Sequence, residues 1–207
     1  MITLADVKKD TGIRALIDAG NRHLEGLGYT DHGPRHVGYV SKTAGKVLEA
    51  LGFEARLVEL ATIAGYVHDV GNSINRNNHG LSGAVLLFPL LLKLDMPMED
   101  VVEIVTAVGN HEEQTGTVTS PIIAALVLAD KSDAHRSRVR GLKPDPSDIH
   151  DRVNFAIVQN QLTVDAEKRV ICHRIAMDTS SSVLEYLQIY MTRIAMCEGG
   201  RLSWLFL

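Results

Sequence analysis

The sequence predicts a mainly α-helical protein that carries a small β-hairpin and a further helix at its C-terminal end. Apolar residues recur at helical spacing through most of the first 140 positions. Two of the apolar segments begin at a first-turn proline, Pro34 and Pro121, and Ser120 is a suitable cap for the second. Beyond residue 148, two segments rich in valine and isoleucine alternate apolar with polar residues, as β-strands do. These three observations favour a helical bundle with an α+β appendage.

The boundary between the two parts is the linker GLKPDPSD, residues 141–148, which contains two prolines and a glycine. We predict a helical domain over residues 1–141 and a hairpin-and-helix segment over residues 142–207 that packs on the same body. A chain of 207 residues is of the size expected for one domain with a small appendage.

The apolar spacing predicts helices near residues 4–25, 34–51, 54–69, 80–94, 97–111 and 121–130. Gly26, Gly28 and Gly52 are suitable stops. Pro89 is expected to kink the fourth helix. The last helix is apolar almost all round, so we expect it to be buried.

In the appendage, residues 152–165 and 168–178 are predicted to form the two strands of a β-hairpin, one face of which lies on the helical body. Three serines then cap a final amphipathic helix over residues 180–198. The apolar tail LSWLFL, residues 202–207, could pair with the hairpin as a small sheet. We expect that hairpin and tail could also mediate a homodimer.

Composition excludes several classes of protein. The net charge of −4 gives no general reason to expect binding to nucleic acid or to a membrane. The apolar run at residues 84–94 is too short to span a bilayer and is interrupted by Pro89 and Lys93. The N-terminus has no signal-peptide core, and Cys172 and Cys197 make no disulfide framework. We therefore expect a cytoplasmic protein.

The adjacent pair His68-Asp69 is the first candidate for chemistry. Neighbouring residues on a helix point about 100° apart, so both can touch one ion only at the helix edge. Other helices must then supply the remaining ligands, and four further candidates stand at or near predicted helix ends: His36, His79, His111 and Asp130. Imidazole with carboxylate suits one or two divalent metal ions, from Fe, Mn, Ni, Zn or Mg.

Each of these positions also has a structural interpretation. An isolated histidine such as His36 is often a cap or a core residue. Asp130 ends a buried run, and a buried carboxylate needs a partner, which a salt bridge to Lys131 or to an arginine would provide.

The series His36, His68-Asp69 and Asp130, with the last residue inside LADKSD, resembles the HD superfamily of metal-dependent phosphohydrolases over residues 29–140. The resemblance implies an HD-domain-like helical bundle in which these four residues hold one metal. His79 and His111 match the extra ligands of the two-metal members. In those members the aspartate of the pair bridges both ions, which implies the same role for Asp69.

Two differences from the motifs of the family limit which of its branches this chain resembles. The branch that hydrolyses cyclic dinucleotides has HDxGK where this chain has HDVGN, and a His-His pair where this chain has Asn110-His111. The ligand set looks more like that of small two-iron members acting on nucleotide polyphosphates, although their spacing to the third histidine differs. The C-terminal hairpin carries no motif of the family.

The resemblance implies hydrolysis of a phosphomonoester or phosphodiester of a nucleotide-like substrate by a metal-activated hydroxide. Coordination to such a metal ion lowers the pKa of water to about 7. We expect Asp69 and Lys131 to be catalytic, and no general acid is identified. The residues expected to contact substrate or its phosphate are Arg35, Asn72, Arg76, Asp133 and Arg136.

Some of these residues have alternative roles. Asp31, His32 and Asn72 could orient ligands through hydrogen bonds, and Lys131 and Asp133 are candidates either for such a supporting role or for contact with phosphate. The arginines could equally be solvated surface charges. Arg136, Arg138 and Arg140 stand at alternate positions, which would place them on one face of an extended segment. With a net charge of −4 and no interleaved aromatic residues, substrate contact or solubility explains them better than nucleic-acid binding does.

Two other functions stay open. Some HD-superfamily members use the same ligands in a two-iron site to activate dioxygen, so an oxygenase is one alternative. The other is a metal-stabilised binding or regulatory module with the hairpin as its contact surface.

Overall fold

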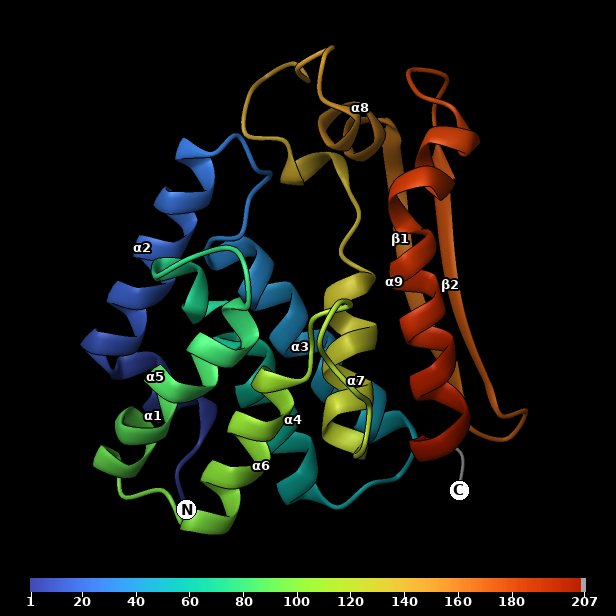
Figure 1. Ribbon diagram of the computed structural model, residues 1–207. Coiled ribbons are helices and arrows are strands. Elements are labelled where there is room, and N and C mark those ends of the chain that lie inside the picture. Colours follow the sequence, from blue (N-terminus) through green and yellow to red (C-terminus); the bar gives the residue numbers. More distant parts are fainter. Residues whose placement is uncertain (206–207) are drawn as a thin grey trace.

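Helix α7 (Pro121–Lys131) runs through the middle of the protein, and every side chain from Ile122 to Ala129 is buried. The computed structural model describes residues 1–205 and is mainly helical, with one small two-stranded sheet. Helices α3, α4, α6 and α9 pack around α7, as Figure 1 shows. The predicted fold class is confirmed.

The remaining elements follow in chain order. They are α1 (Leu4–Lys9), α2 (Thr11–Gly26), α3 (Pro34–Ala50), α4 (Ala55–Val67), the 3₁₀ turn η1 (Val70–Ser73), α5 (His79–Lys93), α6 (Met98–Gly109), the 3₁₀ turn η2 (Arg136–Arg138), α8 (Ile149–Ala156), β1 (Ile157–Asp165), β2 (Val170–Met177) and α9 (Val183–Trp204).

The helix starts that the sequence marks lie where expected. Pro34 and Pro121 each occupy the first turn of their helices, and the Ser120 hydroxyl accepts a hydrogen bond from the Ile123 amide at 3.3 Å. Helix α5 continues through Pro89.

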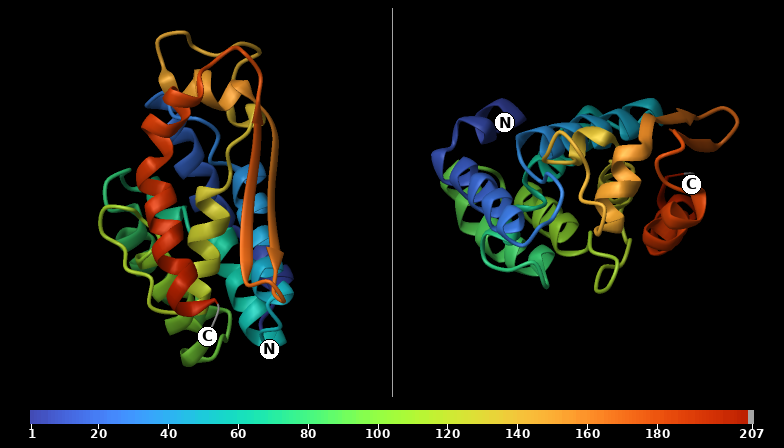
Figure 2. Two further views of the ribbon diagram at one scale, coloured as in Figure 1. Left: turned by 90° about the vertical axis from the view of Figure 1, so that its right-hand side faces the viewer. Right: turned by 90° about the horizontal axis from the view of Figure 1, so that it is seen from above.

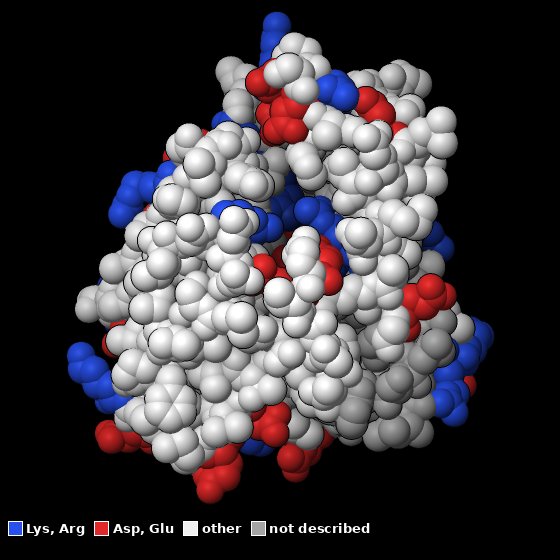
Figure 3. All heavy atoms as spheres, viewed as in Figure 1, with Lys and Arg blue, Asp and Glu red and all other residues white. Residues whose placement is uncertain are grey.

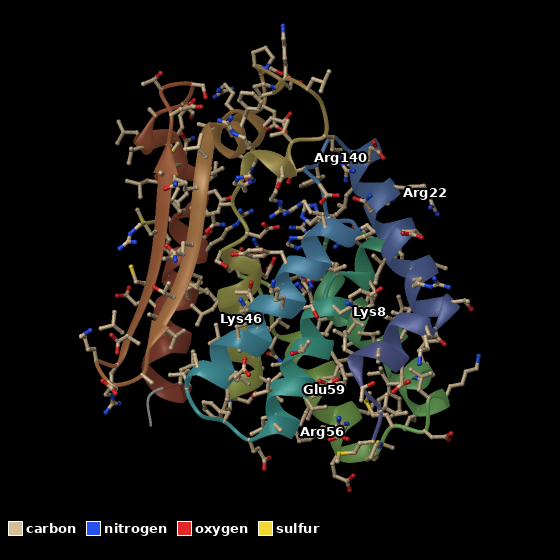
Figure 4. The ribbon with its side chains drawn as sticks, turned by 180° about the vertical axis from the view of Figure 1, so that it is seen from behind. Lys8, Arg22, Lys46, Arg56, Glu59 and Arg140 are labelled. Atoms are coloured by element: carbon tan, nitrogen blue, oxygen red, sulfur yellow. The ribbon has the colours of Figure 1, made fainter. Side chains whose placement is uncertain are left out.

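The N-terminal segment, expected as one helix over residues 4–25, is divided at Asp10. The backbone of Asp10 is extended, and its carboxylate accepts a hydrogen bond from the Ile13 amide at 2.8 Å, so this residue caps α2. Helix α1 turns away to contact α4, where Arg56 and Glu59 bind the backbone of Ile2 and Leu4. Figure 4 labels both α4 side chains.

The first strand begins five residues later than expected, because residues 152–156 belong to α8. Asp148 caps this helix by accepting a hydrogen bond from the His150 amide at 2.8 Å. Val153 and Ala156, three positions apart, are both fully buried, which is a helical spacing. The composition of residues 152–156 favours a strand, but the cap at Asp148 and the buried face stabilise a helix instead.

The hairpin pairs β1 with β2 in antiparallel register, with Leu162 opposite His173. Figures 1 and 2 show the hairpin and α9 next to each other, on the side of the bundle away from α2. The tail does not add a strand over residues 202–204, because α9 continues to Trp204. Residues 206–207 lie outside the described residues.

The segment with three arginines is not an extended stripe, because it contains η2 and its side chains point to different partners. Arg136 pairs with Asp178 at 2.7 Å. Arg140, labelled in Figure 4, donates to Asn21 and to the carbonyl of Tyr29, tying this segment to α2. Only Arg138 is directed toward the buried cluster described below. Among residues 1–205, no helix has the length and apolar character needed to cross a bilayer.

Candidate metal centre

Six buried or nearly buried ligand-type residues from five different helices meet at the centre of the bundle. His36 lies in the first turn of α3, and His68-Asp69 follow α4 directly. His79 opens α5, and His111 comes just after α6. Asp130 lies in the last turn of α7. Every one of these residues stands at a helix terminus, where a side chain can reach an axis shared by several helices.

In each of the four histidines, the Nδ1 atom lies within hydrogen-bond distance of an acceptor. The Nδ1 of His36 lies 2.6 Å from the Asp133 carboxylate. The Nδ1 atoms of His68, His79 and His111 lie 3.0, 3.0 and 2.6 Å from backbone carbonyl oxygens. A carbonyl only accepts, so these nitrogens carry the proton and each neutral ring keeps its Nε2 lone pair for another partner.

These Nε2 atoms point at one another in two pairs. The Nε2 atoms of His36 and His68 are 3.3 Å apart, and those of His79 and His111 are 3.0 Å apart. Two lone pairs at this distance repel unless a cation or a proton lies between them. The arrangement therefore calls for positive charge in both places.

Asp69 lies between the two pairs and offers one oxygen to each. Its Oδ2 is 3.5 Å from the Nε2 atoms of both His36 and His68, whereas its Oδ1 is 3.2 Å from that of His79 and 3.9 Å from that of His111. The Oδ2 atom is buried and has no hydrogen-bond donor within the described residues. A buried carboxylate oxygen without a donor is costly, and a cation would satisfy it.

Asp130 completes the first group, with its Oδ1 at 3.4 Å from His36 Nε2 and 3.6 Å from His68 Nε2. Ligand atoms bonded to one ion at about 2.0–2.2 Å lie roughly 3.0–3.5 Å from each other in tetrahedral or octahedral geometry. The distances in the group of His36, His68, Asp69 and Asp130 agree with that spacing. The residues present therefore fit a divalent metal, and His79 with His111 and Asp69 Oδ1 offer three atoms to a second.

Charges within the cluster keep its carboxylates ionised. Burial acts to raise the pKa of Asp69 and Asp130, but His68 and His79 lower the first well below its usual range, and Lys131 lowers the second. Burial lowers the pKa of His111. The same effect on His79 is outweighed by hydrogen bonds to Asp69 and Glu112, which raise its pKa to about 9. A metal at the second position would take the place of this proton.

Behind His36 lies Asp133, for which the sequence predicts either contact with substrate or support of a metal ligand. This buried carboxylate accepts from His36 Nδ1 and receives two hydrogen bonds from Arg35, at 3.1 and 2.7 Å. Burial opposes ionisation, but Arg138 and the hydrogen bond from His36 lower the pKa of Asp133. Arg35 also pairs with Asp31 at 3.0 Å. Arg35 and Asp133 thus orient a ligand from behind, on the side away from the opening.

A small cavity of about 30 Å³ opens onto the cluster, and we call it the mouth. It is lined by His32, Asp69, Arg76, His79, Glu113, Asp130, Lys131, Arg138 and Arg193. Figure 3 shows lysine and arginine atoms bordering a hollow in which acidic atoms are visible. The mouth is thus bordered by four cations and leads to the carboxylates of the cluster.

The four cations at the mouth differ in how they are held. The Lys131 ammonium lies 2.6 Å from Asp130 and 3.3 Å from Glu113, and Arg193 Nε lies 3.4 Å from the same Glu113 oxygen. Arg138 is buried and donates to the His32 ring at 3.0 Å. Arg76 has no carboxylate partner within the described residues, and its contacts with Asn72 and His79 are long, at 3.4 Å each. Arg76 is therefore the cation most available to an incoming anion.

The remaining predicted residues lie around this centre or outside it. Asn72 donates to the backbone of Asp69 at 3.1 Å, so it supports a ligand. His32 holds Arg138 rather than a ligand. Arg136 pairs with Asp178 on the surface, outside the mouth.

The sequence did not mark four residues of the site as individual candidates: Glu112, Glu113, Arg138 and Arg193. Arg138 was considered only together with Arg136 and Arg140. Glu112 contacts His79 Nδ1 at 3.3 Å and accepts from the Gly80 amide. The acidic pair directly after His111 was a signal for the two glutamates, since a ligand's neighbours in a loop often support it. Arg193, on a helix that begins more than 50 residues after Asp130, carried no signal.

Close packing explains why residue 71, in the HDVGN segment, is a glycine. A methyl group at this position would lie 1.9 Å from the backbone oxygen of His79 and 2.6 Å from the Gly83 amide. The turn that carries Asp69 and the start of α5 that carries His79 can approach this closely only because Gly71 has no side chain.

Comparison with known proteins identifies a relative but no activity. An uncharacterized protein of Methanocaldococcus jannaschii is 24% identical over 192 residues, a match that covers 81% of this chain and 73% of the archaeal protein. No protein-family model matches the chain, and no solved structure matches it.

Proposed function

We propose that this protein is a metal-dependent phosphohydrolase that cleaves a phosphomonoester or phosphodiester of a nucleotide-like substrate. The observation that carries the proposal is the pair of ligand groups joined by Asp69, which opens onto a mouth bordered by cations. In the first group His36, His68 and Asp130 lie within metal-binding distance of one another, and Asp69 Oδ2 lies 3.5 Å from both histidines. The second group offers three ligand atoms.

His36, His68, Asp69 and Asp130 would hold one divalent ion, and Asp69, His79 and His111 would hold a second. When bound, such ions acidify water and neutralise charge on phosphoryl oxygens. The four Nε2 atoms, each without a proton when it binds metal, and the two ionised carboxylates are donors suited to Fe, Mn, Ni or Zn. Asp133 and the backbone carbonyls keep the imidazole rings oriented and their tautomers fixed.

The mouth favours an anionic substrate of phosphate type. Arg76 presents a guanidinium without a carboxylate partner in the described residues, and such a group binds phosphate with two parallel hydrogen bonds. Lys131 and Arg193 share Glu113, and a phosphoryl oxygen can compete with that carboxylate for both cations. Low solvent access at the mouth strengthens these charge interactions.

The test is phosphate release by purified protein loaded separately with Mn, Fe, Ni, Zn and Mg. The substrates are nucleoside mono-, di- and triphosphates and dinucleotides. We expect turnover by the wild type and by His23→Ala, which changes an exposed histidine outside the cluster. Asp69→Asn should lower it at least 100-fold. Undiminished activity of Asp69→Asn, or of the double variant His68→Ala with Asp69→Ala, would contradict the proposal.

The same experiment separates the alternatives. Phosphate release should proceed equally under nitrogen. Turnover of an organic substrate that requires dioxygen would point instead to a two-iron oxygenase. Ligand binding without turnover across the whole panel would favour a binding or regulatory module.

A further inference from the structure

A second, larger cavity adjoins the mouth. It encloses about 270 Å³ between the loop that follows α2, the start of α8 and Arg193 of α9. Four residues line both cavities: His32, Arg76, Arg138 and Arg193. The two cavities therefore adjoin each other along these four side chains.

The two ends of the larger cavity differ in charge. Three arginines stand at the end shared with the mouth. The buried Arg138 there donates to the His32 ring at 3.0 Å, and its Nε atom lies 3.8 Å from the Asp133 carboxylate. At the other end the lining side chains are Asp148, His150 and Asn154, with Tyr29 on the wall of the loop after α2. One end thus suits an anion, and the other suits a neutral group with hydrogen-bond donors.

Asp148 is the strongest acceptor at the far end. One of its carboxylate oxygens accepts from the His150 amide and caps α8. The other oxygen has no hydrogen-bond donor among residues 1–199 and 205, whose side chains the structure describes. Asn154, by contrast, is occupied, since its amide donates to the His150 carbonyl and its oxygen accepts from Tyr190.

We propose that this cavity holds the leaving group of the phosphate ester and that this leaving group is a hydroxyl-bearing sugar or nucleoside that donates to Asp148. The inference rests on the proposed phosphohydrolase function. An apolar alcohol would desolvate Asp148 without replacing its hydrogen bonds. A second anionic group at the far end would face the Asp148 carboxylate and be repelled. A volume of about 270 Å³ lies just below the range of roughly 300–1,000 Å³ typical of small-molecule sites, which suits one sugar or one nucleoside.

The test compares wild type with Asp148→Asn on three esters: a nucleoside 5′-monophosphate, ribose 5-phosphate and p-nitrophenyl phosphate. Asparagine caps a helix as well as aspartate does, so α8 is retained while the second acceptor becomes a donor. We expect kcat/KM for the two hydroxylated esters to fall about tenfold or more, with a change below about twofold for p-nitrophenyl phosphate. A fall in kcat/KM for the nucleoside monophosphate alone would indicate that the cavity binds a nucleoside. A fall for both the nucleoside monophosphate and ribose 5-phosphate would indicate that it binds the sugar that they share.

Asp145→Asn is the matched control, because it changes an exposed carboxylate of the same linker that accepts hydrogen bonds from the amide and hydroxyl of Ser147. Equal losses on all three esters, or no loss, would overturn the inference. If the wild type hydrolyses none of the esters, the proposed function fails separately. In that case the cavity is tested by calorimetry, which measures binding of the nucleoside monophosphate to the metal-loaded protein. Weaker binding to Asp148→Asn than to wild type supports the cavity as a ligand site, and equal binding overturns it.

Discussion

The hydrogen bond between His36 and Asp133 offers a quantitative test of how the metal centre is organised. Asp133→Asn retains the size of the buried side chain but removes the negative charge that accepts from His36 Nδ1 at 2.6 Å. Loss of such a partner lowers metal affinity by about 10–100-fold. This corresponds to about 1.4–2.7 kcal/mol. The loss of the Arg35 contact adds less, because that side chain is about a third exposed and keeps Asp31 at 3.0 Å.

The assay is competition between the protein and a chelating dye for Mn or Zn, at fixed pH. The matched control is Asp31→Asn, which removes the other carboxylate partner of Arg35 but leaves His36 untouched. We expect an affinity within about twofold of wild type for the control. Equal affinity of Asp133→Asn and wild type would refute the reasoning that Asp133 sets the tautomer of His36 for metal binding.

Two further predictions concern the approach to the centre. Gly71→Ala should lower the stability by about 1–3 kcal/mol and reduce bound metal, because the added methyl group displaces the start of α5 that carries His79; chemical denaturation and metal analysis measure both. Arg193→Gln should raise KM for phosphate esters about tenfold while bound metal stays unchanged, since Arg193 lines the mouth without contacting a ligand atom; steady-state kinetics with parallel metal analysis measures this.

Controls exist for both variants. Gly26→Ala places a methyl group where no atom lies within 4 Å, so it should leave stability and metal content near wild type. Arg174→Gln removes an exposed arginine of the hairpin and should leave KM unchanged. Wild-type metal content in Gly71→Ala, or wild-type KM in Arg193→Gln, would contradict the respective prediction.

The clustering of the candidate ligands could be predicted because local signals mark the helix ends on which they stand. Pro34 places His36 in a first turn, and the polar loop before His79 places that residue at the start of the next helix. Amphipathic helices that pack on one buried helix then bring their ends together. That is why residues far apart in sequence could be expected in one cluster without knowledge of their contacts.

The surroundings of the ligands could not be predicted in the same way. Whether Asp133 faces the substrate or the back of His36 depends on how α3 and α7 are rotated toward each other, which spacing alone does not reveal. Arg136, Arg138 and Arg140 would share a face if extended, but the 3₁₀ turn sends them in different directions. Residues 152–156 have strand-like composition, and only the cap at Asp148 and the buried helical face decide their structure.

The most direct test of the central claim is metal analysis of purified wild-type protein beside His79→Ala, after reloading with the same divalent ion. Asp69 offers one oxygen to each histidine pair, so we predict close to two ions per chain in the wild type and close to one in the variant. One ion in both proteins would contradict the second position. The absence of any bound ion in either protein would contradict the metal centre as a whole.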